Sequence, residues 1–331
     1  MIILDNFLAG VRLSVVNKAF VLGAGLGSRL KKLTEKIPKP MIPVFGKPLI
    51  EFSFDHLIQA GIKEFIVNTH HNAKVYTQHF ESSHYQQKPI SFVHEPNLLD
   101  TGGGIKNVSD LLDPNPFIIY NGDVLTDLPL KPLIDEHRDN KFLATLVLRS
   151  NGDAKHIALD RNSKKITDIR NNLNSNNKGT HQFTGIYACS ADFLNYLNQE
   201  RKHSVIPVFL NLIKEQLLGG IVIDEGEWWD LGTRDSYLDA HKKIPLSTFP
   251  SYRNQLNEPL INSNSKTSSI HESCFIDESS FIGENSIIEA NTRIINSVIW
   301  PGAKIIQGSS LERCIVRHKQ TAKGKLENED I

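Results

Sequence analysis

FVLGAGLGSRLKKLTEKIPKP occupies residues 20–40 and runs from an apolar segment through three alternating glycines to Arg29 and to Lys39, which lies between two prolines. Glycine-rich turns let backbone N–H groups approach phosphate oxygens, and the start of a following helix adds a positive dipole end. An Arg in such a loop can grip two phosphate oxygens at once. A Lys held between prolines brings a second cation from a stiff turn. The stretch therefore predicts a phosphate-binding loop at the end of a buried strand.

The spacing of the glycines argues against two common nucleotide-binding motifs. Ser28 stands where a G-x-G-x-x-G fingerprint needs its third glycine, and the next predicted strand ends at Asn68-Thr69 without the acid that binds ribose. A P-loop needs Gly-Lys-Ser or Gly-Lys-Thr, which is missing here. The loop is thus expected to serve a reaction at phosphorus rather than to hold a dinucleotide.

From residue 18 onward, predicted strands and helices alternate. Strands are expected at 19–22, 64–69, 90–95, 116–123, 142–148, 181–189 and from 220, and helices at 48–61, 73–82, 105–112, 207–216 and 235–244. The polar region 150–180 reads as a hairpin. Alternation of this kind is typical of an α/β fold with a parallel sheet and helices on both faces. Ligands in such sheets bind beyond the carboxyl ends of the strands, where GAGLGSR, TGGGI (101–105) and NGD (121–123) all lie.

The C-terminal part has a six-residue repeat. Aliphatic residues recur at 270, 276, 282, 288, 294 and 306, with Trp300 in the remaining position. A fixed six-residue period predicts a parallel β-helix, expected to serve oligomerisation or to cover the first domain. The expected divisions are an N-terminal extension (1–17), a first domain (18–245), a linker (246–261), the β-helix (262–318) and a polar tail (319–331).

The composition of the chain argues against several classes of protein. Lys plus Arg and Asp plus Glu number 37 each in 331 residues, so the chain lacks the basic excess of a nucleic-acid binder. No apolar run approaches the roughly 20 residues of a membrane helix. The three cysteines are odd in number and far apart, which favours a reducing compartment. We expect a cytoplasmic enzyme without nucleic-acid or membrane partners.

Several motifs of the sequence together resemble those of a known protein family. G-A-G-L-G-S-R-L…P-K-P, followed by N-G-D-V and W-D-L-G-T, resembles the sugar-1-phosphate nucleotidyltransferase family over residues 18–245. T-G-G-G-I is similar to members that act on mannose-, heptose- or N-acetylmuramate-1-phosphate, and C-terminal hexapeptide repeats also occur in the family. The resemblance implies a Rossmann-like, mixed, mostly parallel sheet and the reaction of an NTP with a sugar-1-phosphate to give an NDP-sugar and pyrophosphate.

The resemblance also implies roles for single residues. Arg29, Lys39 and Asp123 are implied as catalytic, with Arg29 on the β- and γ-phosphates and Lys39 on the α-phosphate and the sugar phosphate. Asp123 and Asp230 are implied as Mg²⁺ ligands, and one or two carboxylates plus phosphates and water is the usual Mg²⁺ ligand set. The other implied residues are Leu22, Gly23, Gly25, Gly27, Glu95, Thr101 and Gly102 for the nucleotide, and Asn121, Thr184 and Gly185 for the sugar.

The sequence departs from the family in one place, which leaves the substrate open. Residues 167–179 read TDIRNNLNSNNKG, without the Glu-Lys-Pro that places a sugar-contacting Glu in many members. We expect a guanylyltransferase acting on mannose- or heptose-1-phosphate, with a uridylyltransferase acting on N-acetylmuramate- or another sugar-1-phosphate as the alternative. Two further alternatives are a non-catalytic regulatory subunit that binds nucleotide sugars and an enzyme whose β-helix also transfers acyl groups.

Overall fold

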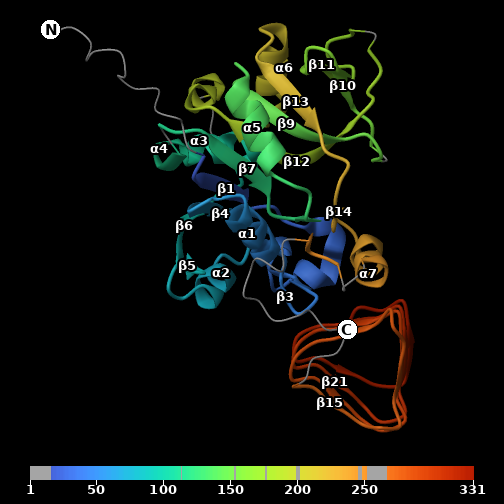
Figure 1. Cartoon of the computed structure of the whole chain (residues 1–331). Helices are drawn as coiled ribbons and strands as arrows, with labels where there is room; N and C mark the ends of the chain where they lie inside the picture. Colours follow the sequence, from blue (N-terminus) through green and yellow to red (C-terminus); the bar gives the residue numbers. More distant parts are fainter. Residues whose placement is uncertain are drawn as a thin grey trace, which may run out of the picture.

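Strand β1 (Lys18–Leu22) lies in the middle of a ten-stranded sheet, and the glycine loop leaves from its carboxyl end (Figure 1). The computed structural model describes residues 16–112, 114–152, 154–175, 177–198, 202–244, 248–251 and 267–331. Most of the expected N-terminal extension and most of the expected linker lie outside these ranges.

The sheet is mixed, and most of its strands run in one direction. Besides β1, its strands are β4 (Glu64–Thr69), β5 (His84–Tyr85), β6 (Lys88–His94), β7 (Phe117–Asn121), β9 (Ala144–Arg149), β10 (Ile157–Asp160), β11 (Lys165–Ile169), β12 (Gln182–Cys189) and β13 (Leu218–Val222). Their order is β10-β11-β13-β9-β12-β7-β1-β4-β6-β5. Strands β7, β1, β4 and β6 are parallel neighbours, and β12 runs antiparallel between β7 and β9. The expected Rossmann-like, mostly parallel α/β fold is confirmed.

Helices cover both faces of the sheet because its central strands are apolar on both sides. In β1, Phe20 points into one core and Ala19 and Val21 into the other. The first core is closed by α3, α4, α6 and η3, the second by α1, α2 and α5. The helices are η1 (Ser28–Thr34), η2 (Lys39–Met41), α1 (Leu49–Gln59), α2 (Lys74–His79), α3 (Asp100–Asn107), α4 (Ser109–Leu112), α5 (Lys131–Asp139), η3 (Ala191–Tyr196), α6 (Ile206–Lys214) and α7 (Arg234–Lys243).

One expected helix begins elsewhere in the structure. The sequence predicts a loop over 101–105 and a helix over 105–112, but α3 already begins at Asp100 and α4 follows as a separate turn. The three glycines are therefore helical, although glycine weakens an isolated helix. The reason is close packing, because a Cβ at Gly102 would lie 2.5 Å from Cδ2 of His203. Local propensity predicts a loop here, and the tertiary contact overrides it.

Two short antiparallel pairs stand apart from the main sheet. They are β2 (Pro43–Val44) with β3 (Lys47–Pro48), and β8 (Val124–Thr126) with β14 (Trp228–Asp230). The second pair places Asp230 opposite Val124, so residues far apart in the sequence meet directly beyond the end of β7. No helix among the described residues has the length and apolarity needed to cross a membrane. All three cysteines are free thiols.

The C-terminal part is a parallel β-helix of three sheets, as the repeat predicts. Its strands are β15 (Ser269–Ile270), β16 (Phe275–Ile276), β17 (Phe281–Ile282), β18 (Ile287–Ile288), β19 (Arg293–Ile295), β20 (Val298–Ile299), β21 (Lys304–Ile305), β22 (Ser310–Glu312), β23 (Ile315–Val316), β24 (Thr321–Ala322) and β25 (Lys325–Glu327). Strands β24 and β25 extend two of the sheets. The expected polar tail, 319–331, is therefore part of the β-helix.

The repeat loses one residue after Ile294, which the sequence pattern did not predict. Ile294 and Ile299 are both inside the β-helix, only five positions apart, and Ile305 rather than Ile306 continues the inner column. Trp300 consequently faces outward, where its Nε1 donates a hydrogen bond to the hydroxyl of Tyr237 at 2.9 Å. Because this coil is one residue shorter, a residue of the expected repeat contacts the first domain instead of the interior of the β-helix.

The outer face of the sheet β17-β20-β23 packs against the first domain. Phe281, Val298 and Ile315 alternate with inward-facing neighbours and join a core that includes residues of η1, β2, α1 and α7. His241 of α7 lies in this core and is fully buried, and its ring centroid is 5.7 Å from that of Phe281. Its Nδ1 donates to the carbonyl of Tyr237 and its Nε2 accepts from the backbone N–H of Phe45.

Stability is expected to fall as the pH drops below about 6.5. Burial lowers the pKa of His241, His56 and His137 from 6.5 to about 4. Between these values the unfolded chain binds protons that the folded rings do not, so the free energy of unfolding decreases by up to about 3 kcal/mol per ring. Denaturant titrations from pH 7.5 to pH 4.5 measure this slope. His241→Gln should lower stability at pH 7.5 and flatten the slope, whereas exposed His84→Gln should leave the slope unchanged; equal slopes in all three proteins would contradict the assignment.

Candidate functional site

A cavity of about 510 Å³ opens at the carboxyl edge of β1, β4 and β7. The residues of its wall come from loops that follow neighbouring parallel strands, as the sheet topology requires. Of the residues implied by the resemblance, those that line the cavity are Leu22, Gly25, Gly27, Arg29, Lys39, Glu95, Thr101, Asn121 and Asp123. Those implied but not in its lining are Gly23, Gly102, Thr184, Gly185 and Asp230.

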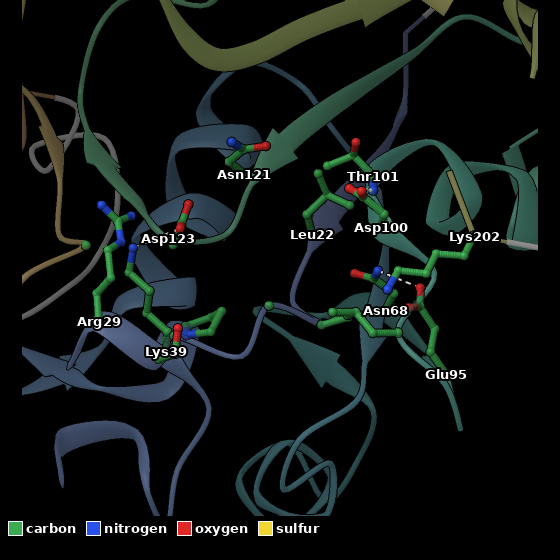
Figure 2. Close-up of a pocket in the computed structure, with 17 residues that line it drawn as sticks. Leu22, Arg29, Lys39, Asn68, Glu95, Asp100, Thr101, Asn121, Asp123 and Lys202 are labelled. Carbon is green, nitrogen blue, oxygen red and sulfur yellow. Dashed lines mark hydrogen bonds and ion pairs between the residues drawn. The ribbon is translucent and has the colours of Figure 1, made fainter. Parts of the chain in front are cut away.

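At one end of the cavity, two cations and one acid of its lining meet a second acid, Asp230, which lies beside the lining. The side chain of Lys39 is only 6% exposed, and its Nζ lies 2.8 Å from Oδ2 of Asp123 and 3.2 Å from Oδ1 of Asp230. Arg29 approaches the same cluster, with Nη2 at 3.8 Å from Oδ2 of Asp230. Figure 2 shows Arg29 and Lys39 side by side with Asp123 above them. The structure thus brings together the three residues implied as catalytic and the second implied metal ligand.

Local structure explains how Lys39 and Asp123 reach this place. Lys39 begins η2 between Pro38 and Pro40, so its backbone is fixed by two rings, as the sequence predicts. Asp123 lies in the turn between β7 and β8. Gly122 precedes it and donates its N–H to the carbonyl of Leu22 at 3.1 Å, where a Cβ would come within 2.7 Å of that oxygen. Only glycine fits so close to β1.

The three glycines of the loop differ in their contacts. Gly23 donates its N–H to Oδ1 of Asn68 and accepts a hydrogen bond from the hydroxyl of Tyr76. Its N–H is therefore committed to Asn68 and is not available to a phosphate. Gly27 has a left-handed backbone, with φ of 60°, and a Cβ there would lie 2.9 Å from Cβ of Lys39. Gly25 lines the cavity, and a Cβ at this position would meet no atom within 4 Å.

The opposite end of the cavity is organised by Asn68 and Glu95. Nδ2 of Asn68 donates to Oε1 of Glu95 at 2.7 Å, and the backbone N–H of Leu99 donates to Oε2 at 3.1 Å. Glu95 is 1% exposed; its Oε1 joins the chain just after β6 to the end of β4, and its Oε2 holds the loop before α3. Figure 2 shows this pair facing Lys202, across the cavity from Arg29 and Lys39. Sequence analysis missed Asn68, although a polar residue that ends a buried strand is a usable signal.

The segment around Lys202 closes the wall beside α3. The N–H of His203 donates to the carbonyl of Leu99, and the carbonyl of His203 accepts from the N–H of Gly103. The hydroxyl of Thr101 accepts from the N–H of Val205 at 3.0 Å. Gly102 therefore serves the packing of this segment. Lys202 lines the cavity and lies in no motif, so nothing in the sequence pattern marks it.

The three residues implied in sugar binding are placed differently from one another. Asn121 lines the cavity at the end of β7. Gly185, with φ of +85°, lies behind it, and a Cβ there would come 2.6 Å from Nδ2 of Asn121. Thr184 is buried, and its hydroxyl donates to the carbonyl of Val147 while its own carbonyl accepts from Nε1 of Trp228. Thr184 and Gly185 thus support Asn121 through an irregularity in β12.

The donor set at the charged end suits a divalent cation that also binds substrate. Asp123 and Asp230 already face one shared positive group, the ammonium of Lys39, and their side chains are 38% and 45% exposed. Among the described residues, no group of three or more His, Cys, Asp or Glu is placed to hold a metal. Two carboxylates leave most coordination positions of Mg²⁺ to phosphate oxygens and water.

A family model described as Nucleotidyl transferase matches residues 18–246. The chain belongs to this family. The matched region contains the whole cavity and ends just after α7, so the β-helix lies outside it.

Curated relatives add to the comparison, and one of them covers most of this chain. A mannose-1-phosphate guanylyltransferase of Mycobacterium tuberculosis is 28% identical over 305 residues, which cover 89% of this chain and 83% of the relative. A D-glycero-alpha-D-manno-heptose 1-phosphate guanylyltransferase of Aneurinibacillus thermoaerophilus is 26% identical, over 69% of this chain and 98% of the relative. An N-acetylmuramate alpha-1-phosphate uridylyltransferase of Neisseria meningitidis is 38% identical, over 34% of this chain and 48% of the relative.

Gly25→Ala is expected to separate nucleotide binding from stability. The new methyl group meets no protein atom within 4 Å, so the melting temperature should stay within about 2 °C of the wild-type value. The methyl group would nevertheless project where the loop faces the cavity, and NTP affinity measured by calorimetry should fall at least about tenfold. Gly27→Ala is the contrasting variant, because the left-handed backbone costs a Cβ about 1–2 kcal/mol of stability. Unchanged NTP affinity in Gly25→Ala would exclude this loop from nucleotide binding.

Proposed function

We propose that this nucleotidyl transferase makes an NDP-sugar and pyrophosphate from an NTP and a sugar-1-phosphate. The observation that carries the proposal is the convergence of Arg29, Lys39 and Asp123 at one end of a single cavity, with Asp230 in contact with both cations. Two cations there match the charge of a triphosphate, and two acids match the needs of a divalent cation. The activities named for the relatives are all of this type.

The proposed roles follow from charge and position. Arg29 binds the β- and γ-phosphates and neutralises the pyrophosphate as it leaves. Lys39 exchanges part of its contact with the two carboxylates for the α-phosphate and the sugar phosphate. Asp123 and Asp230 would hold Mg²⁺, which would supply further neutralisation of the phosphate charge. The sugar phosphate is already an anion, so positioning rather than proton removal from the nucleophile is the task of the protein.

Among substrates, GTP with mannose- or heptose-1-phosphate is the first choice. The guanylyltransferase of M. tuberculosis is similar over a length that includes both the catalytic domain and the β-helix. The alternative is a uridylyltransferase, favoured by the higher identity of the N-acetylmuramate relative over a shorter segment. The end of the cavity away from the catalytic cluster is lined by Asn68, Leu98 and Lys202, and we infer that these residues surround the base of the nucleotide.

A non-catalytic regulatory subunit is the alternative from another class. Such a protein has no need to keep all four charged residues of the cluster. Lys39 is nevertheless buried with both acids in contact, and burial of a lysine is tolerated only when its charge is paired. The cluster therefore supports an active enzyme.

Release of pyrophosphate in the presence of Mg²⁺ tests the proposal. GTP, UTP, ATP, CTP and dTTP are each combined with mannose-, heptose-, N-acetylmuramate-, glucose- and N-acetylglucosamine-1-phosphate. We expect turnover with one main pair, and a loss of at least about 100-fold in kcat in Asp123→Ala and in Asp230→Ala, because each removes half of the carboxylate pair.

Asp239→Ala is the matched control, since Asp239 is an exposed acid of α7 that pairs only with Lys243 among the described residues. It should keep the wild-type kcat. Tight binding of a nucleotide sugar without turnover on any pair would favour the regulatory subunit, and full activity in both Asp123→Ala and Asp230→Ala would refute the assigned roles.

A further inference from the structure

Two segments carry residues of the catalytic cluster, and both lead to contacts with the β-helix on the side away from the cavity. Arg29 belongs to η1, whose buried Leu30 and Leu33 join the core shared with β20 and β23. The other segment, 230–233, leads from Asp230 directly into Arg234, the first residue of α7. Figure 1 shows α7 on the side of the domain that faces the β-helix. The β-helix thus touches both segments from outside the cavity.

Asp330 contacts η1 and Arg234, the residue that directly follows the second segment. Its Oδ1 accepts a hydrogen bond from Nε of Arg234 at 2.7 Å, in an ion pair whose side chains are 21% and 15% exposed. Its backbone carbonyl accepts from Nζ of Lys32 in η1 at 3.2 Å. Asp330 is itself fixed by a parallel bridge to Ile315 of β23. One residue of the last coil therefore connects η1 with the start of α7.

A second arginine strengthens the contact with η1. Nη1 of Arg317, which directly follows β23, donates to the carbonyl of Lys32 at 3.1 Å and lies 3.5 Å from Oε2 of Glu35. The backbone of η1 needs such support, because Lys31 interrupts it with φ of 47° and ψ of −116°. A residue in that conformation is stable only where its surroundings hold it. The β-helix supplies part of these surroundings.

Beside the cavity, the ion pair between the side chains of the same two segments is weak. Nη2 of Arg29 is 3.8 Å from Oδ2 of Asp230, and the side chains are 65% and 45% exposed. An ion pair at this distance and exposure contributes little to the position of either group. The guanidinium also lies against Gly232, where a Cβ would come 2.5 Å from Nη2. The spacing of Arg29 and Asp230 therefore depends on the backbones of η1 and of 230–233.

We propose that Asp330 is a positioning residue for the reaction. By holding Arg234 with its carboxylate and Lys32 with its carbonyl, it fixes the spacing between the segment of Arg29 and the segment of Asp230 and Gly232. The inference rests on the proposed function, because the spacing matters where a triphosphate must meet Arg29 and the acids together. A displacement of 1 Å at such a site can cost about 100-fold in rate.

The first test compares the kinetics of Asp330→Ala with the wild-type protein on the NTP and sugar-1-phosphate that are turned over. We expect kcat to fall about tenfold, while the KM of the sugar-1-phosphate changes by less than about twofold. Asp330→Asn keeps an oxygen that can accept from Arg234, so it should recover most of the lost kcat. A purely structural role would lower the active fraction and would not depend on whether that acceptor oxygen is kept.

Asp235→Ala is the matched control at the same interface. Asp235 is the neighbour of Arg234 and pairs with Nη2 of Arg313 in the β-helix at 2.7 Å, but within the described part of the chain its side chain makes no hydrogen bond or ion pair with η1. It should keep kcat within about twofold of the wild-type value. Wild-type kcat in Asp330→Ala, or an equal loss in Asp235→Ala, would overturn the proposal.

Hydrogen exchange of the substrate-free protein provides a readout that does not depend on turnover. Asp330→Ala removes the carboxylate that holds Arg234 but keeps the backbone carbonyl that holds Lys32, so the amides of residues 230–236 should exchange faster than in the wild-type protein and in Asp235→Ala, with the exchange of β1 and β7 unchanged. If the wild-type protein turns over no substrate pair, the proposed function fails and this measurement still decides whether the carboxylate of Asp330 holds the segment of Asp230. Unchanged exchange of residues 230–236 would refute the inference.

Discussion

The contact of one buried ammonium with two carboxylates is the constraint on which the site depends. Lys39 is almost fully buried, so its charge must be paired, and both partners come from other parts of the chain. Asp123 arrives from the end of β7 and Asp230 from the short strand β14, which pairs with β8. The stiff turn between two prolines keeps Lys39 in place without substrate. The ammonium of Lys39 thus joins three loops, and the proposed reaction uses the same positive charge.

Much of this arrangement follows from the sequence because its signals are local. Strand and helix periodicity locates the central strands, and parallel strands bring GAGLGSR, NGD and their neighbours to one edge. The resemblance of the glycine loop and of the two acidic motifs to the family then implies Arg29, Lys39, Asp123 and Asp230. The structure brings these four together, while the binding roles assigned to them remain proposals. What made them predictable is that each ends a strand or follows a marked turn.

The missed features depend on contacts between distant residues. The local sequence does not show that Gly102 and Gly104 are helical, because distant residues require glycine at both positions. His203 packs closely against Gly102, and Asn68 and Glu95 pack closely against Gly104. Nothing in the six-residue repeat shows where a turn will lose a residue, because Ile299 and Trp300 are both large and apolar. Contacts outside the β-helix decide which of the two faces outward, because the hydroxyl of Tyr237 accepts a hydrogen bond from the indole N–H of Trp300.

The β-helix is therefore more than a C-terminal appendage. Each strand of its third sheet has one residue for the inner column and one for the catalytic domain, as Ile282 and Phe281 show. Such a sheet cannot leave the domain without exposing its outer apolar face to water, so its position is stabilised by the hydrophobic effect. The polar contacts of Arg234, Arg317 and Asp330 lie at the edge of that interface. Apolar packing fixes where the β-helix stands, and these charged groups transmit that position to the backbone that carries Arg29.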